Sequence, residues 1–416
     1  RVISKFSAWD AEHRNIETFN TVEIYKVYKG SVFTSTIDII TEGGVVGTDM
    51  LIVTPTLELS VGDVGIFTAV YDANSTKLRP YASSQGFIKY NEKEGTAKAV
   101  FDAYDSFSSV YSFVQKRTGS NGVEFKSYNP EIQNNQQTLK ATPTISSFSP
   151  TSTSAGTYTL LTINGSNFGA TAGSVDFPDA DDGGASYITA DASLIQSWTD
   201  NQITIYVSEG SSTGKIRVTN STAETGTAAT DLTITYNISG FHNGGLDYTS
   251  DLVNDNGTGG YTFTFNEDYY LNTAAVDRYD EVIEQWRCES GINWGSNGAA
   301  TTSIDANASD GVNVVTFDDN SPLNPGVLGT CYSYFSGCGS GGDVYWSVSE
   351  LDVKFDAGTN WNFTTNSPGG SEYDFYSVML HEMGHGHQLG HVPVTSDVMY
   401  WSISNGVEKR TLNANN

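Results

Sequence analysis

Basic residues are scarce in this sequence. Its 416 residues include 21 Lys+Arg against 48 Asp+Glu, which gives a formal net charge of −27 at pH 7. A surface this acidic repels phosphate backbones and anionic lipid headgroups, so nucleic acid and membrane surfaces are excluded as expected partners. Long apolar runs are also missing, since none approaches the roughly 18 residues that a membrane-spanning helix needs. We therefore expect no membrane span.

Cysteine is equally rare, with only Cys288, Cys331 and Cys338, all in the last third of the chain. No Cys-x-x-Cys pair exists, which argues against a cysteine-ligated zinc knuckle or a thioredoxin-type redox site. The acidic, turn-rich composition favours a secreted, extracellular protein, and we expect one disulfide and one free thiol, with all three pairings open. The first four residues show no signal segment, so a signal was either removed or never present.

The length exceeds what one hydrophobic core usually supports, and we expect three domains, at 1–140, 141–237 and 238–416. The first is predicted to be all-β, because polar and apolar residues alternate between glycine turns over 21–28, 35–40 and 65–70. Within it, only residues 98–117 are compatible with a helix. A polar, Gln/Asn-rich linker is expected at 129–142.

The second region, 141–237, contains short alternating strands at the spacing of a β-sandwich. Its most specific run is Ile163-Asn164-Gly165-Ser166-Asn167-Phe168-Gly169. This run, and the region as a whole, resembles the IPT/TIG family of immunoglobulin-like domains. The resemblance implies an Ig-like β-sandwich that serves as a spacer or a binding module and performs no chemistry.

The third region, 238–416, mixes helix and strand, which indicates an α+β domain. A helix is expected at 274–288, because one of its faces would be apolar: Val276, Tyr279, Val282, Ile283 and Trp286. Strands are expected at 261–265, 312–317, 330–335 and 351–355. A second helix is expected to open at Ser371, where Ser371-x-x-Asp374 fits a capping box.

That second helix carries the residues with the clearest chemistry. His381 and His385 are four positions apart, so a helix projects both imidazoles from one face, within reach of one metal ion. Glu382 follows His381 and can lie beside the ion without binding it, where it can take a proton from the attacking water. His-Glu-x-x-His is the arrangement of zinc peptidases. A chance motif is the alternative, but four of the six histidines fall between 381 and 391.

A third histidine, His391, lies six positions past His385, and Met399 follows eight positions later. Here the sequence resembles the metzincins, and among them the matrixins most closely, with a likeness over roughly 238–403. The resemblance implies that His381, His385 and His391 are zinc ligands. It also implies that Glu382 is the general base and that Met399 forms the floor of the site.

One position departs from that pattern. The family has a glycine three residues past the second histidine, and this chain has Gln388. The position usually adopts a left-handed backbone, which costs a non-glycine residue about 1 kcal/mol or more. We expect Gln388 to have positive φ, held by the metal and by hydrogen bonds from its side-chain amide. The alternative is that Gly386 or Gly390 carries the turn.

The same region contains two further features that could be functional. His387 lies two positions from His385, on the other side of the helix, which favours a polar surface role or support of the site over metal binding. The Asp/Asn-rich loops at 305–310 and 318–320 are candidate structural Ca²⁺ sites, with solvated turns as the more ordinary alternative.

Together these features predict a secreted zinc metalloendopeptidase that hydrolyses polypeptides. The rival hypothesis is an adhesion or extracellular-matrix binding protein with a non-catalytic or latent zinc site, because most of the chain resembles binding or spacer domains. A third hypothesis treats part of 1–140 as a retained inhibitory prosegment.

Overall fold

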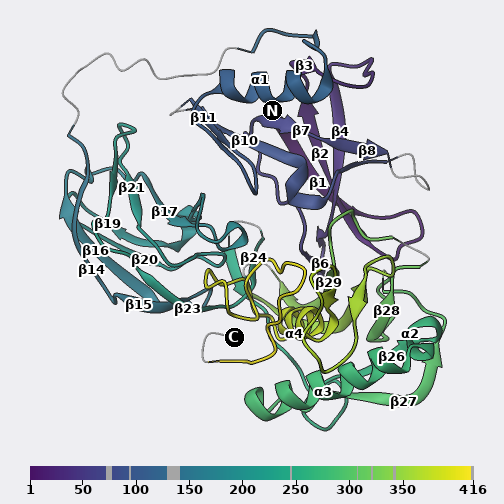
Figure 1. Ribbon diagram of the computed structural model, residues 1–416. Coiled ribbons are helices and arrows are strands. Elements are labelled where there is room, and N and C mark those ends of the chain that lie inside the picture. Colours follow the sequence, from purple (N-terminus) through teal and green to yellow (C-terminus); the bar gives the residue numbers. More distant parts are fainter. Residues whose placement is uncertain are drawn as a thin grey trace. The chain divides into compact units, whose positions relative to one another are not determined.

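The structure is a computed structural model, and it divides into two compact units (Figure 1). It describes residues 1–71, 77–92, 95–128, 141–243, 246–306, 308–319, 322–340 and 343–413. Unit 1 comprises Arg1–Gln136, Asn307–Ser309 and Leu323–Val327, and unit 2 comprises Gln137–Ala306, Asp310–Pro322 and Leu328–Asn416. The predicted linker at 129–142 lies outside the described residues except for its last two positions.

Unit 1 is built from short antiparallel sheets. One sheet has the order β1 (Val2–Trp9), β2 (Ile16–Glu23), β4 (Thr36–Glu42), and another the order β12 (Ala103–Tyr104), β11 (Thr96–Lys98), β10 (Phe87–Asn91), β7 (Gly65–Phe67). The remaining pairs are β3 (Lys26–Val27) with β13 (Val123–Glu124), β5 (Gly44–Val46) with β6 (Asp49–Thr54), and β8 (Ala69–Tyr71) with β9 (Leu78–Pro80). A 3₁₀ turn, η1, covers Ser83–Gly86.

The prediction of an all-β first domain needs a correction, because unit 1 also contains the helix α1 (Phe107–Thr118). The Ser106 side chain caps its start by accepting a hydrogen bond from the Ser109 backbone nitrogen at 3.2 Å. Val110 and Val114, one turn apart, bury their side chains in a cluster with Tyr90 of β10. The helix is shorter than the predicted 98–117, because the earlier residues pair as strands β11 and β12.

The Ig-like region of unit 2 is a sandwich of two four-stranded sheets. The first has the order β14 (Thr144–Ser149), β16 (Leu160–Ser166), β20 (Gln202–Tyr206), β19 (Ile195–Trp198), and the second the order β18 (Tyr187–Thr189), β17 (Ser174–Pro178), β21 (Arg217–Thr219), β22 (Thr225–Thr227). A parallel pair, β15 (Ser152–Ala155) with β23 (Thr233–Asn237), completes it. Two 3₁₀ turns, η2 (Ala180–Asp182) and η3 (Ala192–Leu194), lie between strands.

The space between these two sheets is filled by the apolar side chains that alternate along their strands. Ile163 of β16 and Ile205 of β20 meet Phe177 of β17 in one buried cluster, and each of the three is fully buried. Gly165 allows the strands to close there, since a Cβ would lie 2.0 Å from the Thr144 carbonyl oxygen and 2.4 Å from the Phe168 ring. The residues of the motif singled out in the sequence therefore set the packing of the sandwich.

The rest of unit 2 is a mixed sheet with helices. In this part the strand order is β27 (Gly295–Thr302), β26 (Thr262–Asn266), β28 (Val314–Phe317), β30 (Asp343–Phe355), β29 (Gly329–Ser340). Neighbours pair in parallel except β29, which is antiparallel to β30. Two short pairs accompany it, β24 (Gly240–Asn243) with β25 (Leu246–Thr249) and β31 (Trp361–Asn362) with β32 (Tyr373–Asp374). The helices are α2 (Glu267–Leu271), α3 (Thr273–Ser290) and α4 (Phe375–Gly386).

The helices α3 and α4 pack against each other beside this sheet (Figure 1). The predicted apolar face of α3 is the buried one, with Tyr279, Val282, Ile283 and Trp286 inside, while Val276 is only half-buried. The Trp286 indole nitrogen donates to the Leu380 carbonyl oxygen of α4 at 3.1 Å. Among the described residues, no helix has the length and apolar character needed to cross a membrane.

Candidate metal centre

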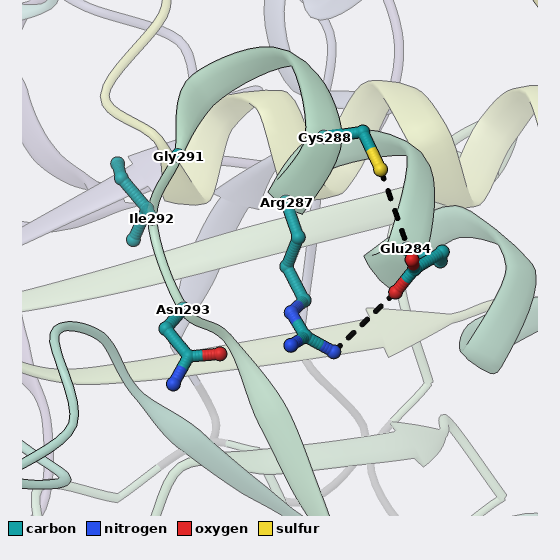
Figure 2. Close-up of a pocket in the computed structure, with 6 residues that line it drawn as sticks. All are labelled: Glu284, Arg287, Cys288, Gly291, Ile292 and Asn293. Atoms are coloured by element: carbon teal, nitrogen blue, oxygen red, sulfur yellow. Dashed lines mark hydrogen bonds and ion pairs between the residues drawn. The ribbon is translucent and has the colours of Figure 1, made fainter.

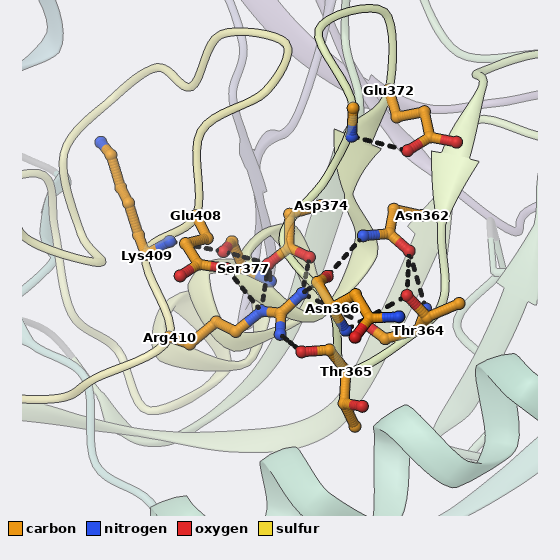
Figure 3. Close-up of polar contacts among 11 residues, drawn as sticks. Asn362, Thr364, Thr365, Asn366, Glu372, Asp374, Ser377, Glu408, Lys409 and Arg410 are labelled. Atoms are coloured by element: carbon orange, nitrogen blue, oxygen red, sulfur yellow. Dashed lines mark hydrogen bonds and ion pairs between the residues drawn. The ribbon is translucent and has the colours of Figure 1, made fainter.

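The first turn of α4 fixes the helix that carries the histidine motif. The helix begins three positions later than predicted, because Asp374 and not Ser371 is its N-cap, and Ser371 belongs to the preceding turn. Asp374 Oδ2 accepts hydrogen bonds from the Ser377 backbone nitrogen at 3.1 Å and from its hydroxyl at 2.5 Å. Figure 3 shows Arg410 reaching the same carboxylate, with Nε 2.8 Å from Oδ2. Because Asp374 is fully buried, Arg410 supplies the positive charge that it needs there.

His381 and His385 project from one face of α4. Their Nε2 atoms lie 3.0 Å apart, and their ring centroids 4.6 Å apart. His381 Nδ1 lies 2.8 Å from the Val398 carbonyl oxygen, and His385 Nδ1 lies 2.8 Å from that of Leu389. Because a carbonyl oxygen can only accept, each Nδ1 must donate, and each Nε2 is left with its lone pair. Both rings are thus held in the tautomer that a metal ion requires.

The chain reverses after α4 at Gln388. Its φ is +65°, which confirms the prediction of a left-handed backbone at this position. Its side-chain Nε2 donates to Ser333 Oγ of β29 at 3.1 Å and to the Gly386 carbonyl oxygen at 3.2 Å, so the amide holds the turn as predicted. Gln388 is 3% exposed. These hydrogen bonds from a buried amide offset the backbone strain that a glycine would have avoided.

This reversal brings His391 to the other two histidines. Its ring centroid lies 5.2 Å from that of His381 and 4.9 Å from that of His385. One ligand atom from each of the three lies within 4.8 Å of the others, the one such group of His, Cys, Asp or Glu in the part of the chain that the structure describes. His391 Nδ1 lies 2.8 Å from Oδ1 of Asp181, which belongs to η2 of the Ig-like region. Its Nε2 is therefore also left for a ligand.

Met399 packs against α4 at the histidine motif. It is fully buried, and the backbone around it is tied to the histidine loop by a hydrogen bond of 2.9 Å from the Val392 nitrogen to the Met399 carbonyl oxygen. Gly384 of α4 faces its thioether, and a Cβ there would lie 2.3 Å from Met399 Sδ. The glycine inside the histidine motif is thus required by the close approach of the methionine.

Glu382 is buried on the side of α4 that faces β29. It is 4% exposed, and its Oε2 has no hydrogen-bond partner among the described residues. A Cβ on Gly329 would lie 2.7 Å from Glu382 Cγ, so the strand passes directly over the carboxylate stem. Burial raises the pKa of Glu382 well above its usual range. A carboxylate left in this state fits a site where a nearby cation supplies the missing charge.

Burial acts in the opposite direction on the histidines. It lowers the pKa of His381 to about 3, and the neighbouring His391 adds to the effect. It also lowers the pKa of His385 well below its usual value, again with help from the other two imidazoles. Neutral imidazoles are the form that binds metal, and two lone pairs 3.0 Å apart need a cation between them. Two nitrogens bound tetrahedrally to one Zn²⁺ would lie about 3.3 Å apart, so the residues present fit zinc.

The three histidines lie in a part of the chain that matches a known protein family. Residues 343–416 match the matrixin family model. That match contains the three histidines, Glu382 and Met399, and it indicates a zinc metallopeptidase. Residues 143–236 match the IPT/TIG domain model, which confirms the resemblance to that family.

Other comparisons add little. No curated protein matches the chain. One solved structure, described as gamma-CGTase from alkalophilic Bacillus clarkii, is similar at 13% identity and a TM-score of 0.17, over 80% of this chain and 42% of that one. At that score the similarity carries no argument, and the chain spans less than half the length of that protein.

His387 lies away from the surface, so of the two roles expected for it the polar surface role is wrong, and support of the site stays a prediction. It is 8% exposed and stacks between Trp286 and Trp294, with ring centroids 4.4 and 3.9 Å away. Its Nδ1 lies 2.8 Å from the Met383 carbonyl oxygen, and its Nε2 lies 3.3 Å from Ser290 Oγ. Its ring therefore lies between α4 and two tryptophans, Trp286 of α3 and Trp294 just after it, and helps to pack these segments together.

The predicted disulfide is wrong for this structure, in which all three cysteines are free. Cys331 and Cys338 lie seven positions apart on the single strand β29, which separates them by about 23 Å, far beyond the reach of a disulfide. Cys288 lies on α3, and Figure 2 shows its thiol pointing to Glu284, with Sγ 3.7 Å from Oε1, beside a surface hollow of about 240 Å³.

The loops proposed for structural calcium form no metal-binding group among the described residues. Positions 307 and 320 of these loops lie outside the described residues. Asp310 Oδ1 accepts a hydrogen bond from the Val312 nitrogen at 3.0 Å, and Asp318 Oδ1 accepts one from the Ala357 nitrogen at 2.7 Å. Asp310 caps the turn that follows it, and Asp318 binds the backbone just after β30, so the expectation of Ca²⁺ finds no support.

Two contacts of the site could not be predicted from the sequence. The Asp374–Arg410 ion pair and the Asp181–His391 contact join residues 36 and 210 positions apart. No local sequence pattern predicts either contact. A carboxylate far away in the sequence cannot be distinguished from an ordinary surface acid by its position alone.

Proposed function

We propose that the chain is a zinc-dependent endopeptidase that hydrolyses peptide bonds within polypeptide substrates. The observation that carries the proposal is the convergence of His381, His385 and His391, each with Nδ1 already engaged, beside a buried carboxylate with an unpaired oxygen. In this assignment the three histidines hold zinc, and Glu382 is the general base. The fold of the region is then an α+β metzincin-like catalytic domain.

Bound zinc would supply a Lewis acid for the scissile carbonyl and lower the pKa of the attacking water. Glu382, next to His381 on the inner face of α4, takes the proton from that water and delivers it to the leaving amide nitrogen. Its burial against β29 keeps bulk water away from the carboxylate and so strengthens each electrostatic interaction in the site. The Val398 and Leu389 carbonyl oxygens keep two of the rings in place throughout.

Secretion and the three-domain division belong to the same proposal. The net charge of −27 and the scarcity of basic residues support an extracellular protein that avoids nucleic acid and anionic membranes. The boundaries 1–140, 141–237 and 238–416 are supported by the IPT/TIG match at 143–236, which lies within the second of them.

The test is a metal analysis combined with a cleavage assay on the full chain. We expect about one zinc per chain, cleavage of denatured protein, loss of cleavage with a zinc chelator, and recovery when zinc is restored. Zinc content can be measured by atomic emission, and cleavage by the appearance of new peptide ends. A chain that holds no zinc would overturn the metal site itself.

A chain that binds zinc at His381, His385 and His391 but cleaves no denatured protein under any condition would favour the rival function. That rival is an adhesion or matrix-binding protein in which the zinc site is structural. Its support is the Ig-like region, which matches the IPT/TIG domain model, because the sequence resemblance to that family implies a spacer or a binding module.

A further inference from the structure

The three histidines of the metal centre are oriented by different kinds of partner. Backbone carbonyl oxygens next to the site, those of Val398 and Leu389, accept from His381 and His385. For His391 the partner is a charged side chain, Asp181, at 2.8 Å and 210 positions earlier in the chain. A carboxylate behind a ligating imidazole fixes its tautomer and makes its other nitrogen a stronger ligand. One of three ligands therefore depends on the Ig-like region.

The loop around Asp181 is built to hold that residue in place. The Asp179 side chain accepts from the Asp181 backbone nitrogen at 2.9 Å, and Asp182 Oδ1 accepts from the Ala185 and Ser186 nitrogens at 2.7 and 3.0 Å. Ala180 between them is fully buried and donates its backbone N–H to the Gly210 carbonyl oxygen at 2.8 Å. Two of the three acids thus bind their own loop, and Asp181 is the one directed to His391.

A second contact joins the Ig-like region to the same ligand loop. The Gly390 nitrogen donates to the Asn237 carbonyl oxygen at 2.8 Å, at the end of β23, and Ser239 donates its backbone N–H to the Gln388 carbonyl oxygen at 2.8 Å. The segment from Gln388 to His391 is therefore attached to the end of the sandwich, just as His391 itself is attached to η2. Both contacts fix the position of the third ligand.

We propose that Asp181 is a positioning residue for His391, so that the Ig-like region completes the metal centre. This proposal rests on the proposed zinc site. The Ig-like region would then support the chemistry of the site, whereas its resemblance to the IPT/TIG family implies only a spacer or a binding module. The effect is limited by solvent, because the Asp181 side chain is 72% exposed while His391 is 7% exposed. We expect its loss to weaken zinc binding about three- to tenfold, at or below the low end of the range for such partners.

The experiment compares the full-length wild type with Asp181→Ala and Asp181→Asn. Asparagine keeps a hydrogen-bond acceptor but loses the charge, and alanine loses both, so zinc affinity should fall in the order wild type, Asn, Ala. Affinity is measured by competition with a chelator of known zinc affinity. The visible spectrum of the Co²⁺-substituted protein should also change in Asp181→Ala, since it reports the geometry of the ligands.

The matched control is Asp231→Asn, which removes one negative charge from an exposed position of the same region. It should leave zinc affinity and the Co²⁺ spectrum unchanged, which separates orientation of His391 from a general change of charge. If Asp181→Ala keeps wild-type zinc affinity and spectrum, the proposal is overturned, while a wild type that binds zinc and cleaves protein still supports the proposed function. If Asp181→Ala fails to fold, Asp181→Asn decides by the same two measurements.

Discussion

The Ig-like region and the C-terminal region of unit 2 bury different kinds of side chain. Every residue of 141–237 is described, and its buried polar groups are Ser, Thr and Asn, with no buried acid or base. The C-terminal region buries Glu350, Asp352, Lys354, Asp374 and Glu382, at 0 to 4% exposure. Burying a charge costs several kcal/mol unless it is paired. The sandwich thus uses its core for stability, while the other region accepts that penalty around its chemical site.

The contrast sharpens at single atoms. Asp374 is fully paired with Arg410 and Ser377, as expected of a structural acid. Glu382 Oε2, Glu350 Oε1 and Asp352 Oδ2 have no hydrogen-bond partner among the described residues. In the Ig-like region the buried oxygens without a partner are two neutral hydroxyl oxygens, Ser211 Oγ and Ser212 Oγ, whereas those of the C-terminal region are carboxylate oxygens, which cost more to bury.

The largest expected effect is on catalysis. Glu382→Gln should keep the zinc and the fold and lower the cleavage rate about 10²- to 10⁴-fold, because the amide cannot accept a proton. Zinc content and cleavage of denatured protein measure the two properties. Glu289→Gln, an exposed position on α3, is the control and should retain full activity. Undiminished cleavage by Glu382→Gln would remove Glu382 from its proposed role.

Substitutions in the core of the Ig-like sandwich should lower the stability of the protein. Ile205→Ala removes a fully buried side chain from the middle of β20 and should lower the free energy of unfolding by about 2–5 kcal/mol. Thr204→Ala, on the half-buried face of the same strand, should change it by about 1 kcal/mol or less. Urea unfolding followed by tryptophan fluorescence compares them. Equal effects would show that the cluster is not the core of the sandwich.

The buried acids of β30 should make stability depend on pH. Burial raises the pKa of Glu350 from 4.5 to about 7, with the neighbouring Asp310 adding to it and the Gly311 nitrogen opposing it. Burial also raises the pKa of the adjacent Asp352. The folded state therefore binds this proton more tightly than the unfolded state, so the stabilisation is complete below pH 4.5 and is lost as the pH rises through 7.

Consequently, the melting temperature of the wild type should fall between about pH 5 and about pH 8 more steeply than that of Glu350→Gln, which has no proton to lose. Differential scanning fluorimetry at several pH values gives both curves. Parallel curves would mean that Glu350 is ionised in the folded protein throughout this range.

The smallest expected effect is at Gln388. Replacement by glycine relieves a left-handed backbone, about 1 kcal/mol, and removes the hydrogen bonds from Nε2 to Ser333 and Gly386, about 1 kcal/mol. The two changes oppose each other, so Gln388→Gly should leave unfolding stability within about 1 kcal/mol of the wild type. Gln388→Ala keeps the strain, loses the amide and should be the less stable variant. A Gln388→Ala variant as stable as the wild type would show that the amide contributes nothing.

Sequence alone determined the features that depend on local periodicity. The four-residue spacing of His381 and His385 fixes their shared helical face in any fold that keeps the helix, and alternation fixes which residues of β16 and β20 point inward. The positive φ of Gln388 was expected because the chain must reverse before His391 and because the family that the motif resembles has a glycine at this position. These predictions succeed because their physical cause lies within a few residues along the chain.

Only the tertiary structure decided which distant groups meet. Three free cysteines, the stacking of His387 between two tryptophans, the cap of α4 at Asp374 and the contact of Asp181 with His391 all depend on packing between separate segments. A side chain's partner across 210 positions is set by how two sheets and a helix come together, and no spacing in the sequence encodes that distance. Local pattern therefore predicted the histidine motif, and packing between segments supplied the groups that contact its side chains.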